Sequence, residues 1–244
     1  MKIMLLYPKW VGAYGVFACF AKKASVWPPL NLAYLSALAE KEGHQVRILD
    51  GQVEDMSLEK MIEQAEAVKP DIIGITATTP FYHIVCDLAK GLKRANNKIP
   101  IIIGGTHITM LKEEAFYPFF DYAFVGESDE SWPEFLERYE NGGDISRVKG
   151  ILFRHDGEIE FTGMPKPVDD IDSIPLPARH LLKMDKYKIG TLQGTKNFTT
   201  ILTIRGCPFK CIFCSTKVFG SKVRKRSPRL VIEEIKSVID KYDT

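Results

Sequence analysis

The fold of this chain follows from the stretch Asp71-Ile72-Ile73-Gly74-Ile75-Thr76. This stretch is an apolar run, rich in β-branched residues, without the polar alternation of a strand that has one wet face. It therefore predicts a strand that is buried on both faces of a parallel sheet. Four similar runs lie in the first 142 residues, at positions 3–7, 46–49, 101–103 and 122–125.

Helical patterns separate these runs, and they predict helices over residues 30–42, 58–68, 81–95, 112–117 and 130–139. Because strand and helix alternate strictly, the crossovers should be right-handed and the sheet doubly wound. The predicted fold class is α/β, with a five-stranded doubly wound parallel sheet of the Rossmann-like or flavodoxin-like kind. Ligands of such sheets bind beyond the carboxyl ends of the strands.

Small, hydroxylated or glycine residues follow three neighbouring strands at those ends. Such residues let a large flat or extended ligand approach the backbone and find hydrogen-bond donors. The alternative, that they only turn the chain, stays open at this point. The candidate residues are Thr76, Thr78, Gly104, Gly105, His107, Gly126 and Glu127.

From residue 143 the pattern changes. His155-Asp156-Gly157 lies between two short β-like runs, and Asp-Gly predicts a tight hairpin turn. A proline-rich stretch without periodicity follows and predicts an extended linker. Residues 199–204 then read as a strand and residues 229–242 as a helix, with Ser227 as its N-cap.

These patterns divide the chain into three parts. Residues 1–142 should form a complete ligand-binding domain, and residues 143–198 a hairpin and linker. Residues 199–244 should form the first part of a second domain, because one strand-loop-helix unit cannot close a core by itself.

Three of the five cysteines crowd into eight residues, with the spacing C-x3-C-x2-C at Cys207, Cys211 and Cys214. Three thiolates on one loop can hold three irons of a [4Fe–4S] cluster and leave the fourth iron without a protein ligand. A zinc site and chance clustering are the alternatives. Cys19 and Cys86 read as ordinary buried thiols.

The composition describes a globular chain of 244 residues, 45% hydrophobic, with a formal net charge of +2. This charge provides no field that would gather nucleic acid or an anionic membrane, so neither partner is expected. The first apolar run stops at Pro8 and is too short for a signal peptide or a membrane span. We therefore expect a cytoplasmic protein.

The cysteine loop, Arg205-Gly206-Cys207-Pro208-Phe209-Lys210-Cys211-Ile212-Phe213-Cys214-Ser215, resembles the cluster loop of radical S-adenosylmethionine enzymes. The N-terminal half is similar to the B12-binding domain found in one subgroup of them. Gly104-Gly105-Thr106-His107 and Gly126-Glu127, like the stretch 71–76, fall where that subgroup places them. The whole chain thus resembles the cobalamin-binding radical S-adenosylmethionine proteins.

The resemblance implies three cofactors: a [4Fe–4S] cluster, S-adenosylmethionine and cobalamin. Cys207, Cys211 and Cys214 would ligate the cluster, and Phe213 would lie near the adenine of S-adenosylmethionine. The nucleotide tail of the corrinoid would insert beside a set of strand-end residues, namely Thr76, Thr78, Gly104, Gly105, Gly126 and Glu127.

The resemblance leaves the lower ligand of cobalt open. No Asp-x-His-x-x-Gly stretch occurs in the chain, so a histidine ligand from the usual loop is not expected. His107 and His83 are the alternatives near a strand end, although such a histidine is more often a satisfied polar residue.

The implied function is methyl transfer to an unactivated carbon by way of a 5′-deoxyadenosyl radical, with a small-molecule substrate. Flavodoxin or ferredoxin would supply electrons, and no catalytic side chain is predicted. Because the rest of the family's barrel would lie beyond Thr244, we expect the chain alone to be inactive. Two other hypotheses remain: a non-catalytic corrinoid-binding module or fragment, and a methylthiotransferase acting on tRNA or a ribosomal protein.

Overall fold

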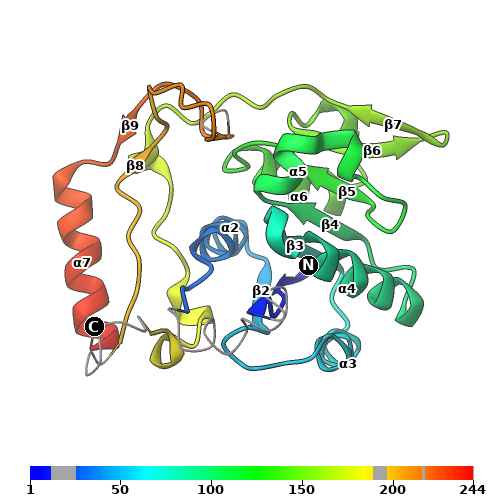
Figure 1. The fold of residues 1–244 in the computed structure, drawn as a ribbon, viewed down its shortest axis with the longest axis horizontal. Helices are drawn as coiled ribbons and strands as arrows, with labels where there is room; N and C mark the ends of the chain where they lie inside the picture. Colours follow the sequence, from blue (N-terminus) through cyan, green and yellow to red (C-terminus); the bar gives the residue numbers. More distant parts are fainter. Residues whose placement is uncertain (12–25, 189–196, 216–217, 244) are drawn as a thin grey trace.

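The computed structural model describes residues 1–11, 26–188, 197–215 and 218–243. Its centre is a seven-stranded sheet with the strand order β2-β1-β3-β4-β5-β6-β7 (Figure 1). The strands are β1 (Lys2–Tyr7), β2 (Gln45–Asp50), β3 (Ile72–Thr76), β4 (Ile101–Gly104), β5 (Tyr122–Phe124), β6 (Ile151–His155) and β7 (Glu158–Phe161).

The first five strands are mutually parallel, which confirms the predicted α/β fold with its doubly wound sheet. All five residues of β3 are buried. In β1, Ile3 and Leu5 pack on one face of the sheet and Met4 packs on the other. The apolar runs lack alternation because helices cover both faces.

Helices α3 (Leu58–Val68) and α4 (Tyr82–Ala95) cover one face, and α2 (Leu30–Lys41) and α6 (Ser131–Glu140) cover the other (Figure 1). All four lie where the sequence predicts them, to within two residues. Ser57 caps α3 by accepting a hydrogen bond from the backbone N–H of Lys60. Cys86 is buried on α4 as predicted, whereas Cys19 lies outside the described residues.

The short helix predicted at residues 112–117 begins earlier. The structure has α5 at Thr106–Leu111, followed by a 3₁₀ turn at Lys112–Ala115. Gly105 is the physical reason, because its φ of 105° ends β4 abruptly and lets the helix start at the next residue. This early start brings α5 close to the carboxyl end of β4.

The predicted hairpin forms, but it belongs to the sheet. β6 pairs antiparallel with β5, and β7 pairs antiparallel with β6. The prediction of five strands was therefore too few, and the sheet is mixed at this edge. A hairpin satisfies the N–H and C=O groups that β5 would otherwise expose at a free edge.

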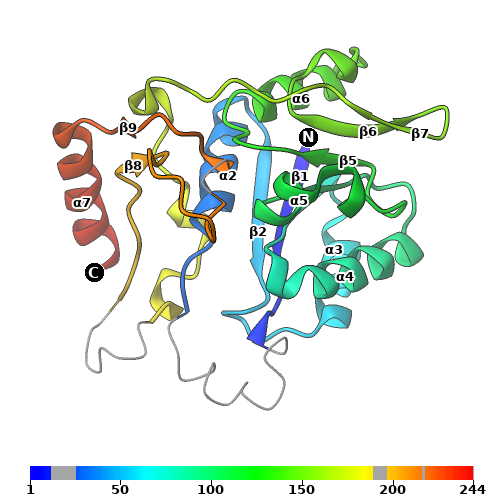
Figure 2. The same cartoon turned by 45° about the horizontal axis from the view of Figure 1, so that its top comes forward.

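The linker runs between α2 and the C-terminal helix α7 (Pro228–Tyr242), and both ribbon views place it there (Figures 1 and 2). Ala178 N–H donates to the carbonyl of Ala33 on α2. Ile171 and Ile174 pack against Tyr34 of the same helix. The linker is thus packed on the first domain along much of its length.

The predicted strand at 199–204 is largely absent. Only Ile204–Arg205 forms a strand, β8, because its antiparallel partner β9 (Arg224–Lys225) is itself two residues long. The predicted Ser227 cap of α7 is confirmed, and its hydroxyl accepts from the N–H of Leu230. No helix in the described parts of the chain is long and apolar enough to cross a membrane.

Candidate functional site

A pocket opens at the carboxyl ends of the central parallel strands. Its volume is about 440 Å³, within the range of small-molecule sites. The β2-β1-β3 order reverses the direction of winding beside β1, and such a switch point leaves a crevice at the strand ends. Six of the predicted strand-end residues line the pocket: Thr76, Thr78, Gly104, Gly105, Gly126 and Glu127.

The rim of the pocket is built largely from backbone. Gly105 must be glycine, because a Cβ there would lie 2.4 Å from the carbonyl oxygen of Ala77 and its φ is positive. Gly104 has no such restraint, since nothing lies within 4 Å of its Cβ position. A side chain at Gly104 would instead fill space that is open to a ligand.

Hydrogen bonds hold the rim in place. The Asn31 side chain donates to Thr76 Oγ1 at 2.9 Å and joins α2 to the end of β3. Thr109 Oγ1 accepts from the Gly126 N–H at 3.0 Å and joins α5 to the segment after β5. The ends of β3 and β5 are therefore each fixed to a neighbouring helix before any ligand binds.

The interior of the pocket is apolar and extends between the sheet and α2. Leu5 and Ile102 of the sheet and Leu35 of α2 line it. The hydroxyl of Tyr34, another lining residue, is buried and makes no hydrogen bond among the described residues. Burial raises the pKa of this hydroxyl, which therefore stays protonated. The pocket thus suits an extended ligand with an apolar end.

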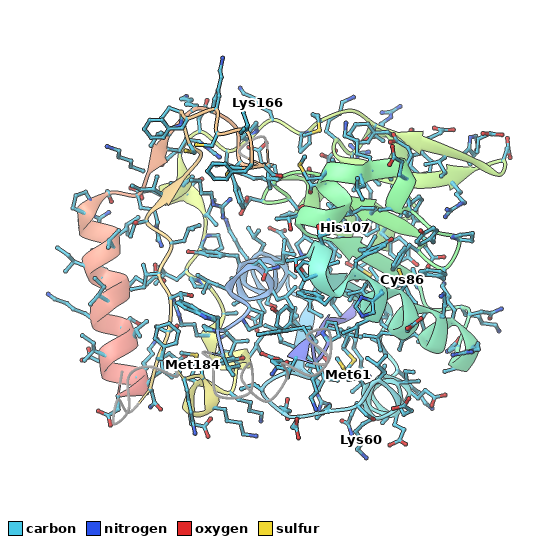
Figure 3. All side chains as sticks on the ribbon, viewed as in Figure 1. Lys60, Met61, Cys86, His107, Lys166 and Met184 are labelled. Carbon is cyan, nitrogen blue, oxygen red and sulfur yellow. The ribbon has the colours of Figure 1, made fainter. Side chains whose placement is uncertain are left out.

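His107 is not among the residues that line the pocket. Its Nδ1 lies 3.0 Å from Thr79 Oγ1, and its ring stacks on Tyr82 with centroids 3.9 Å apart. Burial lowers the pKa of His107, so the ring is neutral at pH 7. Figure 3 labels it on α5, on the same face of the sheet as Cys86, and His83 is exposed on α4.

The three clustered cysteines lie on the loop between β8 and β9, residues 206–223, which we call the cysteine loop. Its neck is tight, because the Cys207 N–H donates to the Gly220 carbonyl and a Cβ at Gly206 would collide with the Lys222 carbonyl. Cys207 is half-buried, whereas Cys211 and Cys214 are exposed.

The structure does not gather these thiols into a metal-binding arrangement. Among the described residues, no group of three Cys, His, Asp or Glu side chains is placed to hold a metal ion. Phe213 is 90% exposed and does not line the strand-end pocket. The donor set itself, three free thiols on one short loop, has the chemistry of an iron–sulfur site.

The far arm of the cysteine loop forms part of the pocket wall. Val218 and Phe219, near the end of the loop, line the pocket together with Arg205 of β8. The strand-end pocket and the cysteine loop, which are far apart in sequence, are therefore in contact through the far arm of the loop. Sequence reasoning could place each site on its own, but not their contact.

Comparison with known proteins supports this picture. Residues 18–136 match the family model described as B12 binding domain. An uncharacterised methyltransferase of Pyrococcus horikoshii is 33% identical over 96% of this chain and 50% of the relative. An anaerobic magnesium-protoporphyrin IX monomethyl ester cyclase of Rubrivivax gelatinosus is 28% identical over 100% of the chain and 43% of the relative.

The first half of the chain is therefore assigned to the B12-binding domain family. The chain spans about half the length of the curated relatives that it matches.

Two solved structures share the fold of this chain. The radical S-adenosylmethionine methyltransferase TsrM from Kitasatospora setae, solved with cobalamin and a [4Fe–4S] cluster, matches with a TM-score of 0.71 at 16% identity, over 98% of this chain and 46% of that one. The cobalamin-dependent enzyme OxsB, solved with aqua-cobalamin and S-adenosylmethionine, matches with a TM-score of 0.77 at 18% identity, over 98% and 31%.

In this B12-binding domain, the sequence analysis did not identify several residues that line the pocket. Asn31 and Tyr34 stand one helical turn apart at the start of α2, and this spacing could have placed them on one face. Asp129 and Arg205 offered no such signal, because their roles depend on a contact between distant segments.

Proposed function

We propose that this chain is the corrinoid-binding and cluster-bearing part of a cobalamin-dependent radical S-adenosylmethionine enzyme that transfers a methyl group to an unactivated carbon of a small molecule. The contact between the strand-end pocket and the cysteine loop carries the proposal. A corrinoid in the pocket and a cluster on the loop would then meet at one reaction space.

The pocket fits the nucleotide tail of a corrinoid. Gly104 leaves the wall open at β4, and the rim offers hydroxyl groups at Thr76 and Thr78. The apolar interior beside Leu5 and Ile102 suits an aromatic base.

The cysteine loop fits a cluster with one open iron. Cys207, Cys211 and Cys214 would hold it, and Phe213 would then have a partner for its exposed ring. When bound, these cofactors supply a carbon-centred radical and a transferable methyl group, and the reaction needs a one-electron donor such as flavodoxin or ferredoxin.

The residues of the chain bind, orient and exclude water. The rim hydrogen bonds at Thr76 and Gly126 hold the strand ends rigid, so a ligand meets a site that needs no reordering. The apolar interior keeps water away from the bound tail. Phe219, on the far arm of the cysteine loop, lines the same pocket.

Oxidative ring closure is the second candidate. Magnesium-protoporphyrin IX monomethyl ester cyclases of Rubrivivax gelatinosus and Cereibacter sphaeroides are 28% and 30% identical to this chain. Hopanoid and phosphonate methyltransferases match over similar lengths at 23–28% identity. We favour methyl transfer because the relative from Pyrococcus horikoshii, at 33% identity, is named a methyltransferase.

Anaerobic reconstitution tests the proposal. The purified chain is incubated with ferrous iron and sulfide, or with hydroxocobalamin, and its iron, sulfide and corrinoid contents are measured after gel filtration. We expect about four irons and four sulfides per chain, and one corrinoid with a shifted absorption spectrum. Corrinoid uptake without iron would overturn the proposal in favour of the non-catalytic module. Binding of neither cofactor would overturn both.

A further inference from the structure

Four charged side chains meet where the cysteine loop joins the rim of the pocket. We call Glu127, Asp129, Arg205 and Arg224 the clasp. Arg224 holds Glu127 through both of its terminal nitrogens, one of them 2.7 Å from Oε2. Arg205 holds Asp129 in the same two-pronged way, at 2.5 and 3.2 Å.

The clasp is one connected network. Arg205 Nη1 also lies 3.4 Å from Glu127 Oε2, so both oxygens of Glu127 face arginines. Arg224 donates further to the carbonyls of Val168 in the linker and Phe219 in the cysteine loop. Its guanidinium therefore ties three segments of the chain to one point.

The clasp is buried. The four side chains are between 2% and 9% exposed. Burial, the largest single influence, lowers the pKa of Arg205, but the hydrogen bond to Asp129 and the charges of Asp129 and Glu127 together outweigh it, so that pKa is raised. Buried ion pairs are rarely a net source of stability, yet removing one partner is strongly destabilising because it leaves a lone buried charge. The main effect of such a pair is therefore to fix the relative positions of the segments that it joins, rather than to add stability.

The position of the clasp relative to the two sites is specific. Glu127 and Asp129 follow β5 and line the pocket. Arg205 precedes the cysteine loop directly, and Arg224 follows it directly. Both ends of the cysteine loop are therefore attached to the same short stretch of the pocket rim.

We propose that the clasp is a positioning device, which holds both ends of the cysteine loop at the pocket rim and so sets the separation of the two sites. Its importance for the reaction rests on the proposed function. The attachment itself is a property of the chain and can be tested without any cofactor.

The test uses the full chain and three clasp variants: Glu127→Gln, Arg224→Met and the double variant that carries both substitutions. Lys222→Met serves as the control. Lys222 is the matched control, because it also joins the loop to the linker, through Asp169 at 2.7 Å, but both side chains are exposed. The double variant guards against misfolding, since replacing both partners of a buried pair is often tolerated.

Two rates are measured: thiol labelling of the half-buried Cys207, and hydrogen exchange of backbone amides in residues 206–223. In each clasp variant, both rates should rise at least about tenfold, because opening of the loop no longer breaks a buried ion pair. Lys222→Met should match the wild type. Arg224→Lys keeps the charge but loses the two-pronged geometry, so its two rates should lie between those of the wild type and those of Arg224→Met.

Hydrogen exchange in β1 and β3 reports the integrity of the sheet in the same samples. Fast loop rates with protected strands would support the proposal. Wild-type loop rates in the folded double variant would overturn it, as would strands that lose protection in parallel with the loop. These rates are measured without cofactors, so they do not depend on whether the chain binds corrinoid or iron. Failure of the proposed function can therefore be distinguished from failure of the clasp proposal.

Discussion

The strand-end pocket and the cysteine loop adjoin each other, yet they are built in opposite ways. The pocket is made of strand ends, glycines and buried apolar side chains, and its rim is closed by hydrogen bonds such as Asn31 to Thr76. The described residues of the cysteine loop, 206–215 and 218–223, have almost no regular structure, and Cys211, Ile212 and Phe213 are exposed to solvent.

This difference follows from what determines each geometry. A pocket wall built of backbone in a sheet is positioned by the burial and pairing of the whole sheet. Thiols on an exposed loop have no packing that would bring them together, and metal-binding geometry of this kind normally forms together with the metal. The first site is therefore preformed, and the second depends on its ends being anchored.

The strongest test of this comparison is the loss of one thiol. Cys207→Ala should abolish cluster formation, because two remaining thiolates cannot hold a [4Fe–4S] cluster stably. Corrinoid binding should be unchanged, since the pocket is preformed. Iron, sulfide and corrinoid contents after reconstitution measure both effects.

Cys86→Ala is the matched control for that prediction. Cys86 is a free thiol but is buried on α4. Its loss should leave the iron content at the wild-type value. A cluster that survives Cys207→Ala, or disappears with Cys86→Ala, would refute the assignment of the loop.

The second prediction concerns a buried carboxylate in the sheet. Asp50, at the end of β2, accepts hydrogen bonds from the N–H groups of Gln52 and Val53 and from the Tyr187 hydroxyl. Burial nevertheless raises its pKa from 3.8 to about 6. The folded state therefore binds a proton that the unfolded state releases, and stability should fall as pH rises through this window.

Asp50→Asn should remove that dependence. The unfolding free energy of the variant, relative to the wild type, should increase by up to about 3 kcal/mol between the two pKa values. Urea unfolding at a series of pH values measures it. Tyr187→Phe should move the wild-type transition to higher pH, because the Tyr187 hydrogen bond lowers the Asp50 pKa. A difference in unfolding free energy between Asp50→Asn and the wild type that does not change with pH would contradict the buried environment of Asp50.

A third variant should fill the pocket without disturbing the sheet. Gly104→Val places a side chain where nothing lies within 4 Å of the Cβ position, so the fold should be retained. Corrinoid affinity should fall at least about tenfold, which is about 1.4 kcal/mol. Titration with hydroxocobalamin measures the affinity, and thermal unfolding monitors the fold.

Gly105→Ala provides the contrast, because its Cβ would meet the Ala77 carbonyl and its φ is positive. It should lower the melting temperature, whereas Gly104→Val should not. Undiminished corrinoid affinity in Gly104→Val would place the ligand elsewhere.

The smallest predicted effect compares two helix caps. Ser57 caps α3 beside the sheet, and Ser227 caps α7 beside the cysteine loop. Replacing either with alanine should cost about 1 kcal/mol. Hydrogen exchange of the backbone amides shows which helices and strands lose stability in each variant.

The two losses should be distributed differently. α7 exposes Ile232, Ile235 and Ile239, and its buried residues are Glu234 and Val238. Ser227→Ala should therefore speed exchange within α7 alone, whereas Ser57→Ala should weaken the whole sheet. Equal effects on the sheet would mean that the two regions unfold as one unit.

Much of the N-terminal half was predictable from local patterns. The five apolar runs became β1 to β5, because a run without polar alternation has a favourable place only inside a covered sheet. Ser57 and Ser227 marked helix starts for a local reason, the need to satisfy free N–H groups. The hairpin turn at Asp156-Gly157 was likewise recognised, but its attachment to β5 was not.

The sequence by itself determined the parallel sheet, the residues at its strand ends and the three thiols on one loop. Each of these depends on residues close together in the chain or on a repeating pattern. Only the tertiary structure decided that His107 does not line the pocket and that Glu127 pairs with Arg224. These contacts join segments far apart in sequence, and the packing of the whole chain selects them.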